Sequence, residues 1–126
     1  MTKEAFCSFE VAKLLKEHGF NEPVIAWYDA TGELHSGIDH IPSAIMCPTH
    51  QMALRWLREE KKIIIWINPV IILPVSDDNT LFSWEWRMKK KIHSYPNVSD
   101  GVKYSTYEEA TDEALKYALR ELISSL

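Results

Sequence analysis

Four side chains that could bind a metal ion or transfer protons lie within one short segment of the chain. His35, His40, Cys47 and His50 occur in the sequence HSGIDHIPSAIMCPTHQ. A structural zinc site needs about four such ligands, and small zinc domains usually supply them as two closely spaced pairs. Two residues separate Cys47 from His50, but four separate His35 from His40, and the combination matches no established zinc pattern. We therefore expect an ordinary loop here, with no metal site and no cofactor.

The same residues could form a nucleophile and its base, with Cys47 attacking and His40 or His50 accepting the thiol proton. Nothing in their spacing indicates that the thiol is activated. The sequence also lacks a GxSxG elbow, a Walker loop and an HExxH motif. We expect no catalytic residue, and an enzyme centred on Cys47 ranks behind two binding hypotheses.

Length and composition favour one globular domain spanning residues 1–126. The chain is 46% hydrophobic and 25% charged, as soluble globular proteins are. Its longest apolar run, residues 63–75, contains two prolines and an asparagine, so it is too short and too broken to cross a membrane. The N-terminus lacks the uniform apolar stretch of a signal peptide. We expect a cytoplasmic protein.

Two further properties limit the classes of partner and cross-link. The net charge of −4 argues against a dedicated nucleic-acid binder, but it permits a local basic patch. Cys7 and Cys47 lie far apart, with no CxxC spacing. Free thiols are the expectation, and a disulfide stays open.

Three segments carry helix signals. Ser8 can cap the first helix, which Gly19 terminates, and Phe20 then packs back on Leu15. Pro48-Thr49 opens the second. The apolar face of that second helix consists of Met52, Leu54, Trp56 and Leu57.

The third helix begins with a predicted capping box made by Ser105 and Glu108. Its inward stripe is Tyr107, Ala110, Ala114, Ala118 and Leu122.

Strand formers occupy the remaining segments. VIAWYD is followed by the turn Ala30–Gly32 and a short partner strand at 33–37. Two longer apolar runs flank the polar cluster SDDN and form a hairpin. The order α-β-β-α-β-β-α predicts an α+β fold, a small antiparallel sheet packed with helices.

The register of the long hairpin can be estimated from its turn. If SDDN is the turn, Val75 faces Thr80, Trp84 faces Ile71 and Met88 faces Ile67. We assign these side chains, with Ile63 and Ile65, to the core. The opposite face is polar on one strand and apolar on the other. Its polar residues are Ser83, Glu85, Arg87 and Lys89, and its apolar residues are Ile64, Trp66, Val70 and Ile72.

Two explanations of this mismatch stay open. Another element covers the apolar row, or Pro69 introduces a bulge that shifts the register. Alternatively the row is exposed and binds a protein partner or a second copy of the chain. Pro69 and Pro74 also suggest an edge strand, where strand addition occurs. The predicted partner-binding residues are Ile64, Trp66, Val70 and Ile72.

The same register gathers lysines at one end of the hairpin. Lys61 and Lys62 enter the hairpin where Lys89, Lys90 and Lys91 leave it. These five residues form either a solvated rim that protects an edge strand or an anion site for phosphate, nucleotide or nucleic acid. A cation–π contact between Trp66 and Lys89 is a further expectation.

Three segments resemble a known protein family. They are SFEVAKLLKEHGFNEP, PTHQMALRWLREEKKIIIWI and STYEEATDEALKYALRELI. Together they are similar to a family of short proteins from gut Bacteroidales and from their phages and other mobile elements. The family has no assigned activity, so the resemblance implies a cytoplasmic accessory protein and transfers no site residue.

The leading hypothesis is a non-enzymatic binding module that uses the sheet edge and the apolar row around Trp66. The alternative is a small-ligand or nucleic-acid binder that uses the lysines.

Overall fold

The computed structural model describes residues 5–37, 44–72, 81–90 and 98–122. Helix α1 (Phe9–Glu17) starts and ends at the predicted residues. The Ser8 hydroxyl accepts a hydrogen bond from the N–H of Val11 and so caps the helix. Gly19 adopts a φ of 94°, and the N–H of Phe20 donates to the carbonyl of Leu15. This closing turn satisfies a terminal carbonyl and confirms the predicted helix end.

Helix α2 (His50–Glu60) is capped by Thr49, whose hydroxyl accepts from the N–H of Met52. It buries His50, Ala53, Trp56 and Leu57. Met52 and Leu54, predicted on the apolar face, are half-buried against the same core. The helix ends at Lys61, and Lys62 turns the chain with a φ of 58°.

Helix α3 (Tyr107–Tyr117) continues into one π-helical turn, η1 (Ala118–Leu122). The predicted capping box is wrong by one residue, because Thr106 caps the helix and its hydroxyl accepts from the N–H of Glu109. Tyr107 is also exposed and does not join the inward stripe. The buried face is wider than predicted and consists of Ala110, Thr111, Ala114, Leu115, Ala118, Leu119 and Leu122.

A small antiparallel sheet has the strand order β2-β1-β3. Strands β1 (Ala26–Tyr28) and β2 (Leu34–Ser36) pair as predicted, around a turn in which Gly32 has a φ of 87°. Strand β3 (Ile45–Met46) was expected to be loop. A strand of two residues is too short to leave a recognisable alternation in the sequence.

Strands β4 (Ile63–Ile72) and β5 (Leu81–Lys90) form the predicted antiparallel hairpin. Their register differs from the predicted one by two residues, so Trp84 lies across from Pro69 and Met88 across from Ile65. A shift of two leaves every side chain on its predicted face, because the pleat repeats every two residues. Pairing continues through Pro69 without a bulge. The predicted SDDN turn lies outside the described residues.

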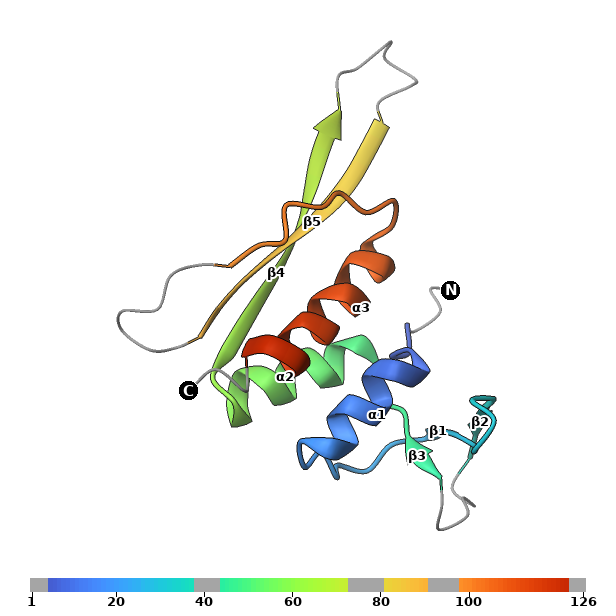
Figure 1. The fold of residues 1–126 in the computed structure, drawn as a ribbon. Helices are drawn as coiled ribbons and strands as arrows, with labels where there is room; N and C mark the ends of the chain where they lie inside the picture. Colours follow the sequence, from blue (N-terminus) through green and yellow to red (C-terminus); the bar gives the residue numbers. More distant parts are fainter. Residues whose placement is uncertain (1–4, 38–43, 73–80, 91–97, 123–126) are drawn as a thin grey trace.

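The three helices lie between the long hairpin and the small sheet (Figure 1). Helices α2 and α3 pack on the hairpin face that carries Ile63, Trp86 and Met88, which are fully buried. Helix α1 packs on β3 and α3. The α+β class is confirmed, with β3 added to the predicted order. Within the described ranges, none of the helices is long and apolar enough to cross a membrane.

Candidate functional site

The hydrogen bonds of β5 determine which edge of β4 is open. On the side of β5 away from β4, Trp84 exchanges both backbone hydrogen bonds with Tyr104, and Met88 exchanges both with Val98. Even-numbered residues of β5 therefore point their amides away from β4, and odd-numbered residues point theirs toward it. The register then makes Ile64, Trp66, Asn68 and Val70 the residues of β4 that bond to β5.

The odd-numbered residues of β4 direct their N–H and C=O groups to the other edge. Ile65, Ile67 and Ile71 have no backbone hydrogen-bond partner there within the part of the chain that the structure describes. We call this row the outer edge of β4. The prediction that β4 is an edge strand is confirmed for the described residues.

Pro69 lies on this outer edge as well. Proline has no N–H, and at this position the missing donor removes no bond between β4 and β5. The unbroken register through Pro69 follows from this placement. The proline predicted an edge strand, and the hydrogen bonds of β5 now place it in the row whose amides face outward.

The predicted partner-binding residues lie on the face of the hairpin opposite the core. Trp66 is 42% exposed, whereas Ile64 and Val70 are half-buried. Ile72 ends β4, and its side chain is outside the described part. The structure adds one residue that sequence analysis missed. Ile71 lies on the same face of β4 as the core residue Ile63, but it is 62% exposed, whereas the sequence predicted it in the core.

A basic row on β5 lies beside these apolar residues. Arg87 is directly across from Trp66, and Lys89 is directly across from Ile64. Arg87 is exposed, and its Nε lies 3.6 Å from the carboxylate of Glu85. Lys103 also binds Glu85 at 3.0 Å and, as the strongest influence, lowers the pKa of that carboxyl group. This group of two cations and one carboxylate keeps a net positive charge.

The register brings the predicted lysines to the same end of the hairpin, because Ile63, which follows Lys62, pairs with Lys90. The described lysines make different contacts there. The ammonium group of Lys61 lies 5.3 Å from the centre of the Trp56 ring, and Lys62 donates to the carbonyl of Glu59 at 2.8 Å. Lys90 is buried on the core face and interacts with another group of the protein. Lys89 lies diagonal to Trp66, as expected, but the cation–π contact at this end of the hairpin joins Lys61 to Trp56. Lys91 is outside the described residues.

The candidate zinc ligands lie in separate environments. The His35 ring contacts the Asp29 carboxylate at 2.8 Å and stacks on Trp27. The His50 ring instead contacts Asp112, and Cys47 is fully buried beside Cys7. His40 is outside the described residues.

Among the described residues, Asp29, Glu33 and His35 offer ligand atoms within 4.8 Å of one another. One oxygen of Asp29 already accepts three hydrogen bonds within its own turn, from Thr31 and Glu33. The hydrogen bond from the Thr31 hydroxyl has the largest effect in lowering the pKa of Asp29, followed by the hydrogen bond to His35 and that from the N–H of Glu33. The turn itself therefore accounts for this arrangement.

Both thiols are protected in the core. Cys47 donates to the carbonyl of Cys7 at 3.3 Å, and burial raises the pKa of the Cys47 thiol to about 11. Burial likewise raises the pKa of Cys7. A thiol needs a lowered pKa and access to act as a nucleophile. These two have neither.

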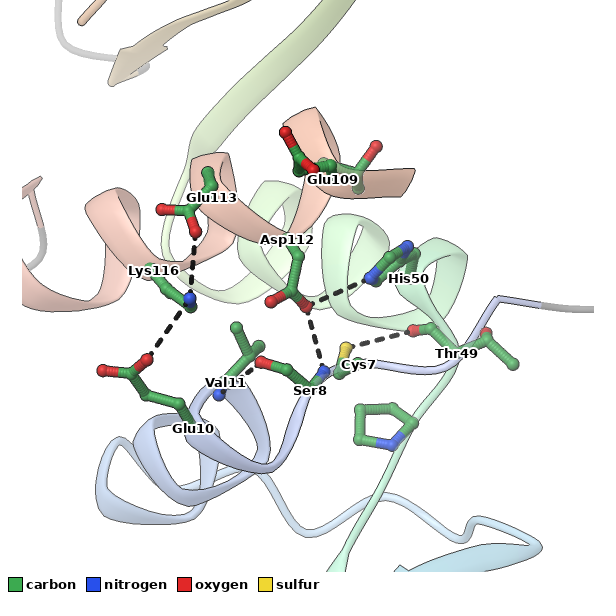
Figure 2. Close-up of polar contacts among 12 residues, drawn as sticks. Cys7, Ser8, Glu10, Val11, Thr49, His50, Glu109, Asp112, Glu113 and Lys116 are labelled. Carbon is green, nitrogen blue, oxygen red and sulfur yellow. Dashed lines mark hydrogen bonds and ion pairs between the residues drawn. The ribbon is translucent and has the colours of Figure 1, made fainter. Parts of the chain in front are cut away.

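A polar contact inside the molecule was missed by sequence analysis. Asp112 of α3 accepts one hydrogen bond from the N–H of Ser8 at 2.9 Å and a second from Nε2 of His50 at 3.2 Å. Figure 2 shows the carboxylate between these two donors, the cap of α1 and the first residue of α2. Burial alone would raise the pKa of Asp112, but these two hydrogen bonds outweigh it and lower that pKa. No sequence spacing could have indicated a contact between residues this far apart.

An open groove of about 810 Å³ lies beside the start of α2. Ile25 and Tyr107, which are both well exposed, line it together with Arg55 and His50. Arg55 is paired with Glu22, and Nε2 of His50 faces Asp112. The lining also includes the polar residues Thr49, Gln51, Arg58 and Glu108.

Comparisons with protein-family models, curated proteins and solved structures gave no match. The resemblance to a Bacteroidales and phage family stays a prediction. The function is therefore inferred from the geometry of β4.

Proposed function

We propose that the protein is a non-enzymatic interaction module that binds an extended segment of another protein along the outer edge of β4. One observation carries this proposal. The amides of Ile65 and Ile67 point outward without a backbone partner in the described chain, beside the exposed ring of Trp66.

Unpaired strand edges attract further strands, because each added residue pair satisfies backbone donors and acceptors. Natural proteins usually blunt such an edge with a short strand, charges or a covering element. Strand β4 is ten residues long, and the side chains that line it from Ile63 to Ile67 are all apolar. Pro69 blocks one position and leaves the preceding stretch available.

Strand addition needs no catalytic residue, metal ion or cofactor. Binding by strand addition uses main-chain hydrogen bonds for affinity and side chains of the edge strand for specificity. The anion-binding alternative has less support, because Lys61, Lys62 and Lys90 are each engaged within the molecule.

A strand-forming peptide tests the proposal directly. We suggest a capped, uncharged peptide of about eight residues alternating Val and Ser, titrated into isotopically labelled protein and followed by NMR. Hydrogen bonding to the edge should shift the amide signals of Ile65 and Ile67 strongly. The signals of Ile64 and Trp66, whose amides already bond to β5, should shift less.

Ile67→Pro is the blocking variant, because it removes an outward donor and leaves the bonds to β5 in place. Ile67→Val is its matched control, with the donor retained. Loss of binding in the first variant and retention in the second, with both folded by circular dichroism, would support strand addition. Equal binding by the two variants would contradict it.

Self-association is the second form of the same proposal. Sedimentation of the wild type and of Trp66→Glu would detect a dimer built on this surface. A wild type that is monomeric at high concentration would eliminate the dimer and leave only a different protein as the partner.

A further inference from the structure

We infer that the segment bound by β4 is acidic, with carboxylates alternating with apolar residues. This inference rests on the proposed function and adds the chemistry of the partner. Its basis is the basic row of Arg87 and Lys89, which lies one strand away from the open edge.

The geometry places a bound strand within reach of that row. Neighbouring strands are about 4.8 Å apart, so a strand added to β4 lies about 9.6 Å from β5. A glutamate on the added strand and a lysine or arginine on β5 can together span this distance across the top of β4. Lys89 lies directly across from Ile64 and Arg87 directly across from Trp66, so a glutamate on the same face of the added strand would be one strand away from each cation. Neither Ile64 nor Trp66 offers a competing charge.

The charge balance of this face favours a negative partner. Arg87 and Lys103 both pair with Glu85, and Lys103 is the closer of the two to that carboxylate. Lys89 has no ion-pair partner among the described side chains. The chain as a whole has a net charge of −4, so the attraction is local to this row. Screening confines it to about 8 Å at physiological salt.

The two faces of the added strand meet different surfaces. On the face of Trp66, its side chains meet the apolar row and the basic row behind it. On the opposite face they meet the half-buried Ile65 and Ile67. Because strand side chains alternate between faces, acidic residues are expected at every second position and apolar residues between them. The methylene groups of the acidic side chains would cover the exposed ring of Trp66.

A second copy of the chain fits this surface less well. If two β4 strands paired, the side chains offered to Arg87 and Lys89 would be Ile64, Trp66, Asn68 and Val70 of the other copy. None of these is acidic, so a dimer would leave the basic row without a partner. Charge complementarity therefore selects a different protein.

Three capped peptides of about eight residues test the inference: alternating Val and Glu, Val and Ser, and Val and Lys. Binding is measured by fluorescence anisotropy at about 50 mM and about 500 mM salt. At the lower salt we expect the Val-Glu peptide to bind about tenfold more tightly than the Val-Ser peptide, as two exposed ion pairs allow. The Val-Lys peptide should bind most weakly. At the higher salt the three affinities should converge.

Charge reversal supplies the decisive variant. Arg87→Glu combined with Lys89→Glu should reverse the preference in favour of the Val-Lys peptide. Lys13→Glu combined with Lys16→Glu makes the same change in net charge on α1, which packs away from the hairpin. This control should keep the wild-type preference.

The outcomes separate the inference from the proposed function. Equal binding of all three peptides, with shifts at Ile65 and Ile67, would overturn the acidic partner and support strand addition. A dimer that excludes every peptide would also overturn it, in favour of a second copy. A monomer that binds none of the peptides would overturn both proposals.

Discussion

At the scale of single residues, Asp112 links the starts of α1 and α2 to α3 through its carboxylate. This carboxylate accepts hydrogen bonds from Ser8, the cap of α1, and from His50, the first residue of α2, while Asp112 is itself part of α3. Figure 2 also shows Lys116, one turn later, between Glu10 of α1 and Glu113 of α3. The partly exposed Lys116 pairs contribute little, whereas hydrogen bonds to a largely buried carboxylate contribute more.

We expect Asp112→Asn to lower the free energy of unfolding by about 1–3 kcal/mol at pH 7, because two donors would lose a charged acceptor. The folded-state pKa of Asp112 is below its unfolded value. Its stabilising contribution is therefore complete above the unfolded pKa of about 3.9 and is lost as pH falls through the folded pKa. Urea unfolding at pH 7 and in acid would measure the free energy of unfolding of both proteins. The difference between the variant and the wild type should become smaller as pH falls.

Glu109→Gln is the matched control for that measurement. Glu109 lies one turn earlier on the same helix and is exposed, so its substitution should change stability by less than about 0.5 kcal/mol. A pH-independent loss in Asp112→Asn would show that side-chain packing, and not the carboxylate charge, is responsible.

Single residues also show where sequence analysis reached its limit. The spacing of the histidines and cysteines gave no reason to expect a zinc site. In the structure His35 contacts Asp29, His50 contacts Asp112, and Cys47 donates to the carbonyl of Cys7. The contact between His50 and Asp112 joins residues 62 positions apart. Local spacing carries no information about such a pair.

At the scale of elements, short-range rules predicted most of the structure. The caps at Ser8 and Thr49 and the terminator Gly19 were predictable, since each acts within about one helical turn. The hairpin faces were also predictable from alternation, although its register was not. Register depends on where the turn begins, and the polar cluster SDDN alone did not determine that position.

Two glycines with positive φ allow an element-scale prediction. Gly32→Ala and Gly19→Ala should each lower stability by about 1 kcal/mol, because both positions require the left-handed region. Gly32→Ala should cost more, since its added Cβ would lie 3.2 Å from the Phe9 ring, whereas nothing lies within 4 Å at Gly19.

Thermal unfolding of the two variants would measure this difference. The effect at Gly32 should also be partly relieved when Phe9 is replaced by Leu, which makes room for the methyl group. Equal losses at the two glycines would show that the Phe9 ring moves aside without penalty.

At the scale of the whole molecule, one core joins all three helices to both sheets. Cys7 and Cys47 are fully buried in it, together with Leu15, Leu57 and Leu115. Helical spacing predicted several residues of this core, but not that one core serves both sheets. That arrangement depends on contacts between distant segments, such as α1 with α3.

The thiols therefore report on unfolding of the whole molecule. We expect Cys7 and Cys47 to react with a thiol reagent about a thousandfold or more slowly in the folded protein than in urea, because exposure requires opening of the core. Ser36→Cys, at an exposed position of β2, should add one thiol that reacts at once. Rapid reaction of both native thiols at pH 7 would contradict the buried positions.

The hydrogen bond from Ser8 to Asp112 spans 104 residues. During synthesis the N-terminal helix leaves the ribosome long before the carboxylate that orients it has been translated. Contacts of such wide sequence separation slow folding and expose apolar segments in the meantime. Emerging chains that stop before Tyr107 should therefore lack a stable core and engage chaperones. Completion of the last helix would then be the step that releases them.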